Sequence, residues 1–361
     1  MRAFEQWLAD LPPGYFALVM ATGIIAAAAL QQHLGMLGRA LFWTAGAFYV
    51  ALWILLALRA GRYGTRIARD LTTLPRAPSC LAAVAATNVL GVGFVSIIGW
   101  RSAGVALWWL GIILWGVIFY TVIAALAIRD PKPEVAGGVS GDWLMLVVST
   151  ESVAVLGALL AAPSRRPDEL LFASLAMCTT GLFLYSVVIT LICYRWWLEP
   201  MAAVGATPSY WINMGALAIT TLAFAEIGAD ATIVPRLAPL GPFLHGMTVL
   251  AWAGASWWIP LLVIIGVWRH LIRRVPVRYD PQYWSLVFPL GMYAVATHRM
   301  ATTLDLSFLE WIPRVFLVIA LFAWTLTLVG MVRSTAQSPW PSCRDAGGTG
   351  IRTSRASRRS D

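Results

Sequence analysis

The amino-acid sequence predicts an all-α integral membrane protein of ten transmembrane helices, arranged as five helical hairpins. Two observations carry this prediction. Hydrophobic residues make up 59% of the 361-residue chain and charged residues only 12%, whereas soluble domains average about 25% charged residues. Apolar segments also recur along the chain, each with about the twenty residues that a helix needs to cross a bilayer.

The predicted segments cover nearly all of residues 1–333, which form one transmembrane domain and leave no stretch for a soluble one. The loops between them are short, which favours antiparallel neighbours. Residues 334–361 are rich in Ser, Gly and Arg and are predicted to form a disordered tail, because they cannot bury a core. The predicted spans are 14–32, 38–58, 79–99, 103–128, 142–162, 170–194, 208–228, 240–268, 282–302 and 310–332.

The distribution of Lys and Arg predicts the orientation. Most of the 26 basic residues lie in the tail, at the amino terminus and in the loops after even-numbered segments, of which Arg59–Arg76 and Arg269–Arg278 are the richest. By the positive-inside rule, both termini of this multi-pass chain face the cytoplasm, and we expect it in the plasma (inner) membrane. The positive charge lies in loops and tail, so no nucleic-acid partner is predicted. The cysteines show no CxxC spacing, and we expect no disulfide, metal or cofactor.

The odd-numbered segments share an opening motif. Pro13, Pro78, Pro208 and Pro281 begin the first, third, seventh and ninth segments, and Gly141-Asp142 begins the fifth. Proline is common just inside a helix start. The repeat indicates a two-helix hairpin used five times.

Small residues are concentrated at mid-depth in the odd segments, whereas the even segments carry more Leu, Ile, Val and Trp. This split predicts five inner helices around a central pore and five outer helices outside them. The alternative is close helix packing without a cavity. Alignment on the opening motifs predicts that the pore is lined by Met20, Thr22, Thr87, Asn88, Val147, Ser149, Gly215 and Gly291.

Phe288 and Pro289 lie in the middle of the ninth segment. A proline there removes a backbone hydrogen bond and kinks the helix. The ring of Phe288 falls in a layer of otherwise small or flexible side chains, so we expect it to close the pore as a gate. The alternative is a packed Phe at a tolerated kink.

The predicted pore carries no central cation. All five inner helices would direct their partly positive amino ends to the cytoplasmic mouth, and an anion further in would meet hydroxyls and amides. This arrangement favours weak binding and fast passage. Near the outer ends, His245, His298 and Arg299 form a predicted outer vestibule, with interfacial side chains as the alternative.

Glu151 is an acid near the middle of the fifth segment. Ionised acids inside a membrane are expensive and are functional candidates by default. Glu151 is therefore predicted to couple proton movement to anion movement. The alternative is a hydrogen-bonded Glu that fastens its helix to neighbouring hydroxyls.

Three motifs identify a family resemblance: PPGYFALVMATGI in the first segment, YWINMGALAITTLA in the seventh and YWSLVFPLG in the ninth. Together, over about residues 11–333, they resemble the slow-type anion channel and TehA family, also called the tellurite-resistance/dicarboxylate transporter family, with its malic acid transporters and sulfite efflux pumps. The first and seventh motifs resemble the malate and sulfite branch more than TehA.

The resemblance implies five hairpins around a pore, usually in a homotrimer, and a gating Phe before the ninth-helix proline, here Phe288 before Pro289. The fifth segment departs from the family pattern: VSTESVAVLG has no proline and carries Glu151, which argues against simple channel behaviour.

We therefore expect transport of a small anion, either a C4-dicarboxylate such as malate or an oxyanion of the sulfite or tellurite type. An uncoupled gated channel is the alternative. A membrane haem protein would need facing His pairs at matched depth, and no His lies in mid-membrane. An intramembrane hydrolase would need a base beside Ser149, and none is apparent, so no enzyme activity is predicted.

Overall fold

A computed structural model describes residues 2–74, 76–130, 138–162, 164–231 and 234–337. The described chain is a bundle of long helices with no strand, and the predicted all-α membrane fold is confirmed. A short helix α1 (Arg2–Asp10) precedes the bundle. Five hairpins follow, with these bounds: α2 (Phe16–Gln31) and α3 (Gly35–Thr72), α4 (Ala82–Gly93) and α5 (Arg101–Ile128), α7 (Met145–Leu159) and α8 (Pro167–Leu198), α9 (Ile212–Ala231) and α10 (Gly241–Val267), α11 (Trp284–Thr303) and α12 (Trp311–Gln337).

Burial separates the helices into an inner and an outer set. Within the apolar windows that contain α2, α4, α7 and α9, 72–89% of residues are buried, against 17–28% in those of α3, α5, α8, α10 and α12. Most residues of α11 are also buried. The inner and outer assignment from small residues is therefore confirmed.

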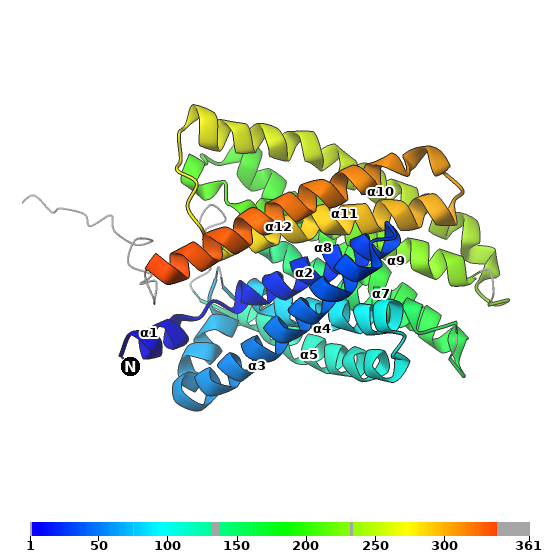
Figure 1. The fold of residues 1–361 in the computed structure, drawn as a ribbon, viewed down its shortest axis with the longest axis horizontal. Coiled ribbons are helices and arrows are strands. Elements are labelled where there is room, and N and C mark those ends of the chain that lie inside the picture. The colour runs from blue at the N-terminus through cyan, green and yellow to red at the C-terminus, as the bar shows by residue number, and fades with distance from the viewer. Residues whose placement is uncertain (1, 75, 131–137, 163, 232–233, 338–361) are drawn as a thin grey trace, which may run out of the picture.

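The inner helices form a closed ring. Each one contacts the next, in the order α2, α4, α7, α9, α11 and back to α2. Each outer helix packs on the inner helix of its own hairpin. The helices run side by side along the long axis of the bundle, and the amino terminus and the carboxyl end of α12 lie at the same end (Figure 1).

Nine helices of the described chain are long and apolar enough to cross a membrane. The tenth member of the bundle, α11, falls outside this set because His298, Arg299 and several small polar residues lower its mean hydropathy. It nevertheless packs against α2, α9 and α12. Because these three neighbours are each long and apolar enough to span the membrane, we infer that α11 spans it as well.

Each inner helix begins with a short 3-10 turn at the repeated opening motif. The turns are Pro13–Tyr15, Pro78–Leu81, Gly141–Leu144, Pro208–Trp211 and Pro281–Tyr283. They contact one another in a ring of the same order as the helices, so all five inner helices run in one direction. Gly141 lies directly against the backbone of Ser209 and Tyr210, where a Cβ atom would clash. We call this end of the bundle the amino-end face.

The segment Arg59–Arg76, predicted as a loop, is helical as far as Thr72, which corrects that prediction. The chain bends at Tyr63, which has non-helical φ and ψ of −137° and 39°. The bend brings Asp70 back to Arg59, whose Nη2 atom donates to Asp70 Oδ2 at 2.6 Å.

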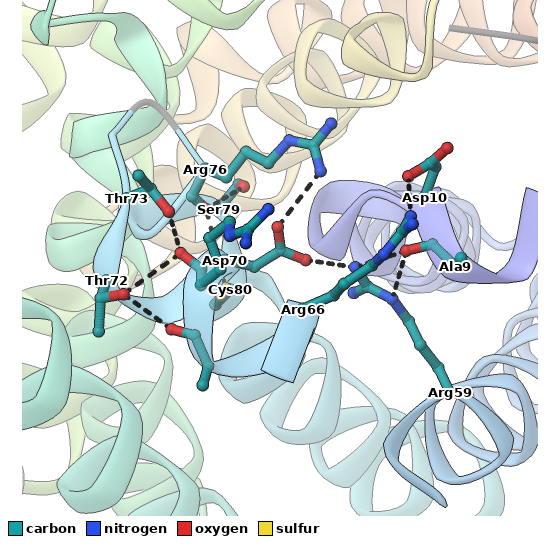
Figure 2. Close-up of polar contacts among 12 residues, drawn as sticks. Ala9, Asp10, Arg59, Arg66, Asp70, Thr72, Thr73, Arg76, Ser79 and Cys80 are labelled. Carbon is teal, nitrogen blue, oxygen red and sulfur yellow. Dashed lines mark hydrogen bonds and ion pairs between the residues drawn. The ribbon is translucent and has the colours of Figure 1, made fainter. Parts of the chain in front are cut away.

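Figure 2 shows the polar network around this ion pair. The guanidinium of Arg59, 2% exposed, also donates twice to the carbonyl of Ala9 at 3.2 and 3.0 Å. Arg76 Nη1 lies 3.2 Å from the other oxygen of Asp70. Arg59 donates both to the Asp70 carboxylate and to a carbonyl near the end of α1. These bonds hold residues 59–72 folded back against the amino-end face. The network therefore ties α1 and the chain leading into α4 to α3.

The predicted domain boundary lies at the carboxyl end of α12. This helix continues through Gln337, so the first four residues of the predicted disordered tail, 334–337, are helical. From residue 338 onward the predicted tail lies outside the described residues.

Candidate functional site

A small cavity lies on the axis of the bundle, and all five inner helices line it. Its volume is about 30 Å³, room for one or two water molecules. The lining is mostly aliphatic, with Asn88 and Ser152 as its polar members. The lining residues are Gly23, Ile24 and Ala27 from α2, Asn88, Val89 and Val92 from α4, Ser152 and Val155 from α7, Ile219 and Leu222 from α9, and Met292 and Val295 from α11.

The lining follows one register on every inner helix. Phe288 precedes Met292 and Val295 by four and seven residues, so it lies on the same face of α11, about 6 Å nearer the amino-end face. Phe288 is 1% exposed. By the same spacing, Met20, Ala85, Val148, Gly215 and Phe288 lie one turn nearer the amino-end face than the lining residues of their helices, and all five are buried.

Four members of this layer are those that the sequence alignment put together with Phe288. On α7 the spacing selects Val148 in place of the predicted Val147. The alignment used Asp142 as the third residue of the opening turn, whereas the turn begins at Gly141 and its third residue is Trp143. Counting from Trp143 instead of Asp142 moves the aligned residue on α7 from Val147 to Val148.

Pro289 lies beside Gly215 of the neighbouring helix α9. A Cβ atom on Gly215 would lie 2.7 Å from Cγ of Pro289. Gly215 therefore supplies the room for the proline ring at the α9–α11 contact. Gly291 has a similar packing role toward α2, because a Cβ atom there would lie 2.9 Å from Cγ2 of Ile24.

The predicted pore hydroxyls point away from the axis. Thr22 accepts a hydrogen bond from the Trp324 indole on α12 at 3.0 Å, and the Thr87 hydroxyl lies 2.8 Å from that of Tyr49 on α3. The same inner–outer contact recurs where Trp115 of α5 donates to Thr150 at 2.9 Å and Trp252 of α10 donates to Thr297 at 2.9 Å. The sequence predicted that Thr22 and Thr87 line the pore, whereas in the structure their hydroxyls contact outer helices.

Of the eight predicted lining residues, all within the described chain, Asn88 lines the cavity. Its Nδ2 atom donates to Ser152 Oγ at 3.0 Å and to the carbonyl of Val84 at 3.1 Å. Ser149 is fully buried and donates to the carbonyl of Leu146 within its own helix. The sequence analysis missed Ser152, which its repeat register did not select.

The carboxyl of Glu151 lies between α7, α8 and α9, away from the cavity. Its Oε1 atom accepts a hydrogen bond from Thr220 Oγ1 at 2.9 Å. The thiol of Cys178 on α8 faces the same carboxyl. Gly181 of α8 leaves the necessary room, because a Cβ atom there would lie 2.5 Å from Oε1. These contacts favour the fastening alternative for Glu151 over a place in the pathway.

Two predicted vestibule residues, His298 and Arg299, lie near the carboxyl end of α11 and are paired with acids, whereas His245 lies near the start of the outer helix α10. Arg299 donates to Glu226 of α9 at 2.8 Å, and His298 Nδ1 lies 3.1 Å from Glu310. His245 of α10 lies against Gly228 of α9. The charge of Arg299 is therefore largely neutralised by Glu226.

Comparison with known proteins gives matches over the same region of the chain. The family model described as SLAC1, voltage-dependent anion channel, matches residues 10–332. An uncharacterized membrane protein of Mycobacterium tuberculosis is 39% identical over 155 residues, 43% of this chain and 78% of that protein.

More distant relatives match nearly the whole chain. An uncharacterized transporter of Methanocaldococcus jannaschii is 20% identical over 90% of this chain and 95% of its own length. A sulfite efflux pump of Trichophyton rubrum is 23% identical over 90% of this chain and 91% of its own length. Because the family match covers nine complete helices of the bundle and most of α12, the chain belongs to the voltage-dependent anion channel (SLAC1) family, whose members transport anions across membranes.

Proposed function

We propose that this protein conducts a small anion along the axis of the inner ring, and that Phe288 closes this pathway. The observation that carries the proposal is the central cavity lined by all five inner helices, with Phe288 one turn below it on the same face of α11. The aliphatic lining adds a second barrier, because a narrow apolar constriction excludes water and ions until it widens. A closed pathway of this kind accounts for the small volume of the cavity.

The ring of helix starts supports the choice of an anion. Five amino-terminal turns meet at the amino-end face, and each carries a partial positive charge. The cavity lining within the described chain includes no Lys or Arg, so an anion would be attracted to the mouth without being held in the lumen. This combination fits passage better than capture.

We further propose that the substrate is a small oxyanion of the sulfite type. The fungal sulfite efflux pump aligns with 90% of this chain. Bulky residues such as Ile24, Leu222 and Met292 line the narrow cavity, so a compact anion requires less widening of the pathway than a C4-dicarboxylate does. Tellurite and malate stay as competing substrates for the experiment below.

Flux measurement in proteoliposomes tests the proposal. Sulfite, malate, tellurite and chloride efflux would be compared for the wild type, Phe288→Ala and the control Phe224→Ala. Phe224 is a fully buried ring on α9 two residues beyond Leu222, which places it on the opposite side of the helix from the cavity. Both variants lose a buried ring, at about 3–5 kcal/mol.

Removal of a gate raises sulfite flux in Phe288→Ala and leaves it unchanged in Phe224→Ala. If the two variants have equal flux, or if Phe288→Ala has wild-type flux, the gate is refuted. If malate crosses faster than sulfite, the substrate assignment is refuted and the gate is kept.

The orientation and assembly belong to the same proposal. Both termini of the described chain lie at one end of the bundle, which supports placing them on the same side of the membrane, in the cytoplasm of a plasma membrane. The homotrimer rests on the family resemblance. Cysteine labelling of intact cells and mass measurement of the purified protein test these two points.

A further inference from the structure

A groove on the side of the bundle lies outside the anion pathway. It has a volume of about 350 Å³ and is formed where the carboxyl end of α10 passes the starts of α9 and α11. Its walls are mainly apolar, and Val263 and Val267 on its rim are exposed on the side of the bundle that faces lipid. The groove therefore opens toward the bilayer at the level of the amino-end face.

Basic residues stand at the polar end of this groove. Arg269 and His270 line it, and Arg273, Arg274 and Arg278 follow in a stretch that contains no acid before Asp280. Within the described chain, no Asp or Glu forms an ion pair with any of these four arginines. The stretch therefore carries uncompensated positive charge.

The guanidinium of Arg269 is held by a hydrogen bond to the backbone, and one of its other nitrogens has no hydrogen-bond partner within the part of the chain that the structure describes. Its Nη1 atom donates to the carbonyl of Ala206 across the groove. Its Nε atom is buried and has no partner among the described residues. A guanidinium whose orientation is fixed by a bond to the backbone is preorganised to bind a phosphate oxygen.

We propose that this groove binds an anionic phospholipid, with an acyl chain along Val263, Gly266 and Leu286 and the phosphate at Arg269. Charge complementarity decides the occupant. Basic pockets between transmembrane helices bind anionic lipid head groups, and basic clusters next to a helix end are attracted to anionic leaflets. A lipid here contacts the starts of α9 and α11, the two inner helices that carry Gly215 and Phe288.

A larger side chain at Gly266 would fill the groove without a clash with the protein. It lines the groove, and a Cβ atom on it would meet no atom within 4 Å. Gly266→Leu therefore occupies the acyl site without displacing protein. Gly246, on the same helix and equally open to an added Cβ atom, lies outside the groove and provides the matched control Gly246→Leu.

The test is native mass spectrometry of the full-length protein in detergent, titrated with phosphatidylglycerol or phosphatidylcholine. The variants are Gly266→Leu and Arg269→Gln, and the controls are Gly246→Leu and Arg62→Gln, an exposed arginine of α3. One cation near the membrane surface contributes about 1 kcal/mol, or about fivefold in affinity. We expect phosphatidylglycerol affinity to fall at least about fivefold in both groove variants and to stay at the wild-type value in both controls.

Three outcomes overturn the proposal. Equal binding of the two lipids by the wild type removes the role of charge. Unchanged phosphatidylglycerol affinity in Gly266→Leu removes the groove as the site, whether or not Arg269→Gln folds. Conversion of an oligomer to a monomer in Gly266→Leu, with lipid affinity unchanged, assigns the groove to a second copy of the chain.

Discussion

The buried ion pair between Arg59 and Asp70 makes a sharp prediction about the stability of the amino-end face. Removal of one partner of a buried pair costs about 3–5 kcal/mol, because it leaves an uncompensated charge. Arg59→Met leaves Asp70 with Arg76 at 3.2 Å, so we expect a loss near 3 kcal/mol. Asp70→Asn keeps an amide oxygen as a possible acceptor but removes the negative charge, which leaves the guanidinium, 2% exposed, without its nearest counter-ion, and we expect a loss near 5 kcal/mol.

The double variant separates this pair from a general packing effect. Arg59→Met with Asp70→Asn leaves no buried charge unpaired, and its main penalty is the Ala9 carbonyl without donors, about 1–3 kcal/mol. It should thus be more stable than Asp70→Asn. Unfolding in mixed SDS micelles, followed by far-UV circular dichroism, measures all three. Losses that simply add would refute the coupling between the two side chains.

A second ion pair at the same end provides the control. Arg66 and Asp10 are also 2.6 Å apart, but their side chains are 47% and 49% exposed. Exposed pairs contribute about 0–1 kcal/mol. Arg66→Met should therefore have almost no effect on unfolding. A loss as large as that of Arg59→Met would show that distance, and not burial, sets the contribution.

Two further predictions concern the inner helices. Glu151→Gln preserves the acceptor for Thr220, so anion flux and its dependence on pH should match the wild type, measured in proteoliposomes with and without a pH gradient; loss of the pH response would restore proton coupling through this residue. Gly215→Ala places a Cβ atom 2.7 Å from Pro289, and overpacking of this kind costs about 1–3 kcal/mol. Thermal unfolding in detergent should show that loss, while Gly246→Ala, which meets no atom within 4 Å, should unfold as the wild type does.

The sequence could predict the hairpins and the ring because both leave a signal in composition. Inner helices must pack on several neighbours, so they carry small residues, while outer helices face lipid and carry large apolar ones. The repeated opening proline supplied the register, and it brought Met20, Gly215 and Phe288 to one depth. Where the proline is missing, at Gly141, the alignment and the helical spacing differ by one residue.

The direction of the threonines could not be predicted in the same way. In water, a polar side chain marks the exposed face of a helix, but in a bilayer neither face is wet. Thr22 could satisfy its hydroxyl in a lumen or against a neighbour, and its position along α2 is the same in both cases. The deciding partner, Trp324, lies 302 positions away in the chain. Similarly, the helical course of residues 59–72 depends on the contact between Arg59 and Ala9, which no local pattern reveals.

The outward hydroxyls and the apolar lumen have one common consequence for gating. Because hydroxyls of α2, α4, α7 and α11 are bonded to Trp or Tyr of the outer helices, these four inner helices are fixed in rotation and present mainly aliphatic side chains to the axis. Opening by rotation would break several of these bonds at once. A movement confined to α11 breaks fewer, and this helix already lacks a backbone donor at Pro289. The residue before that proline is Phe288, so among the inner helices the one that lacks this donor is the one that carries the proposed gate.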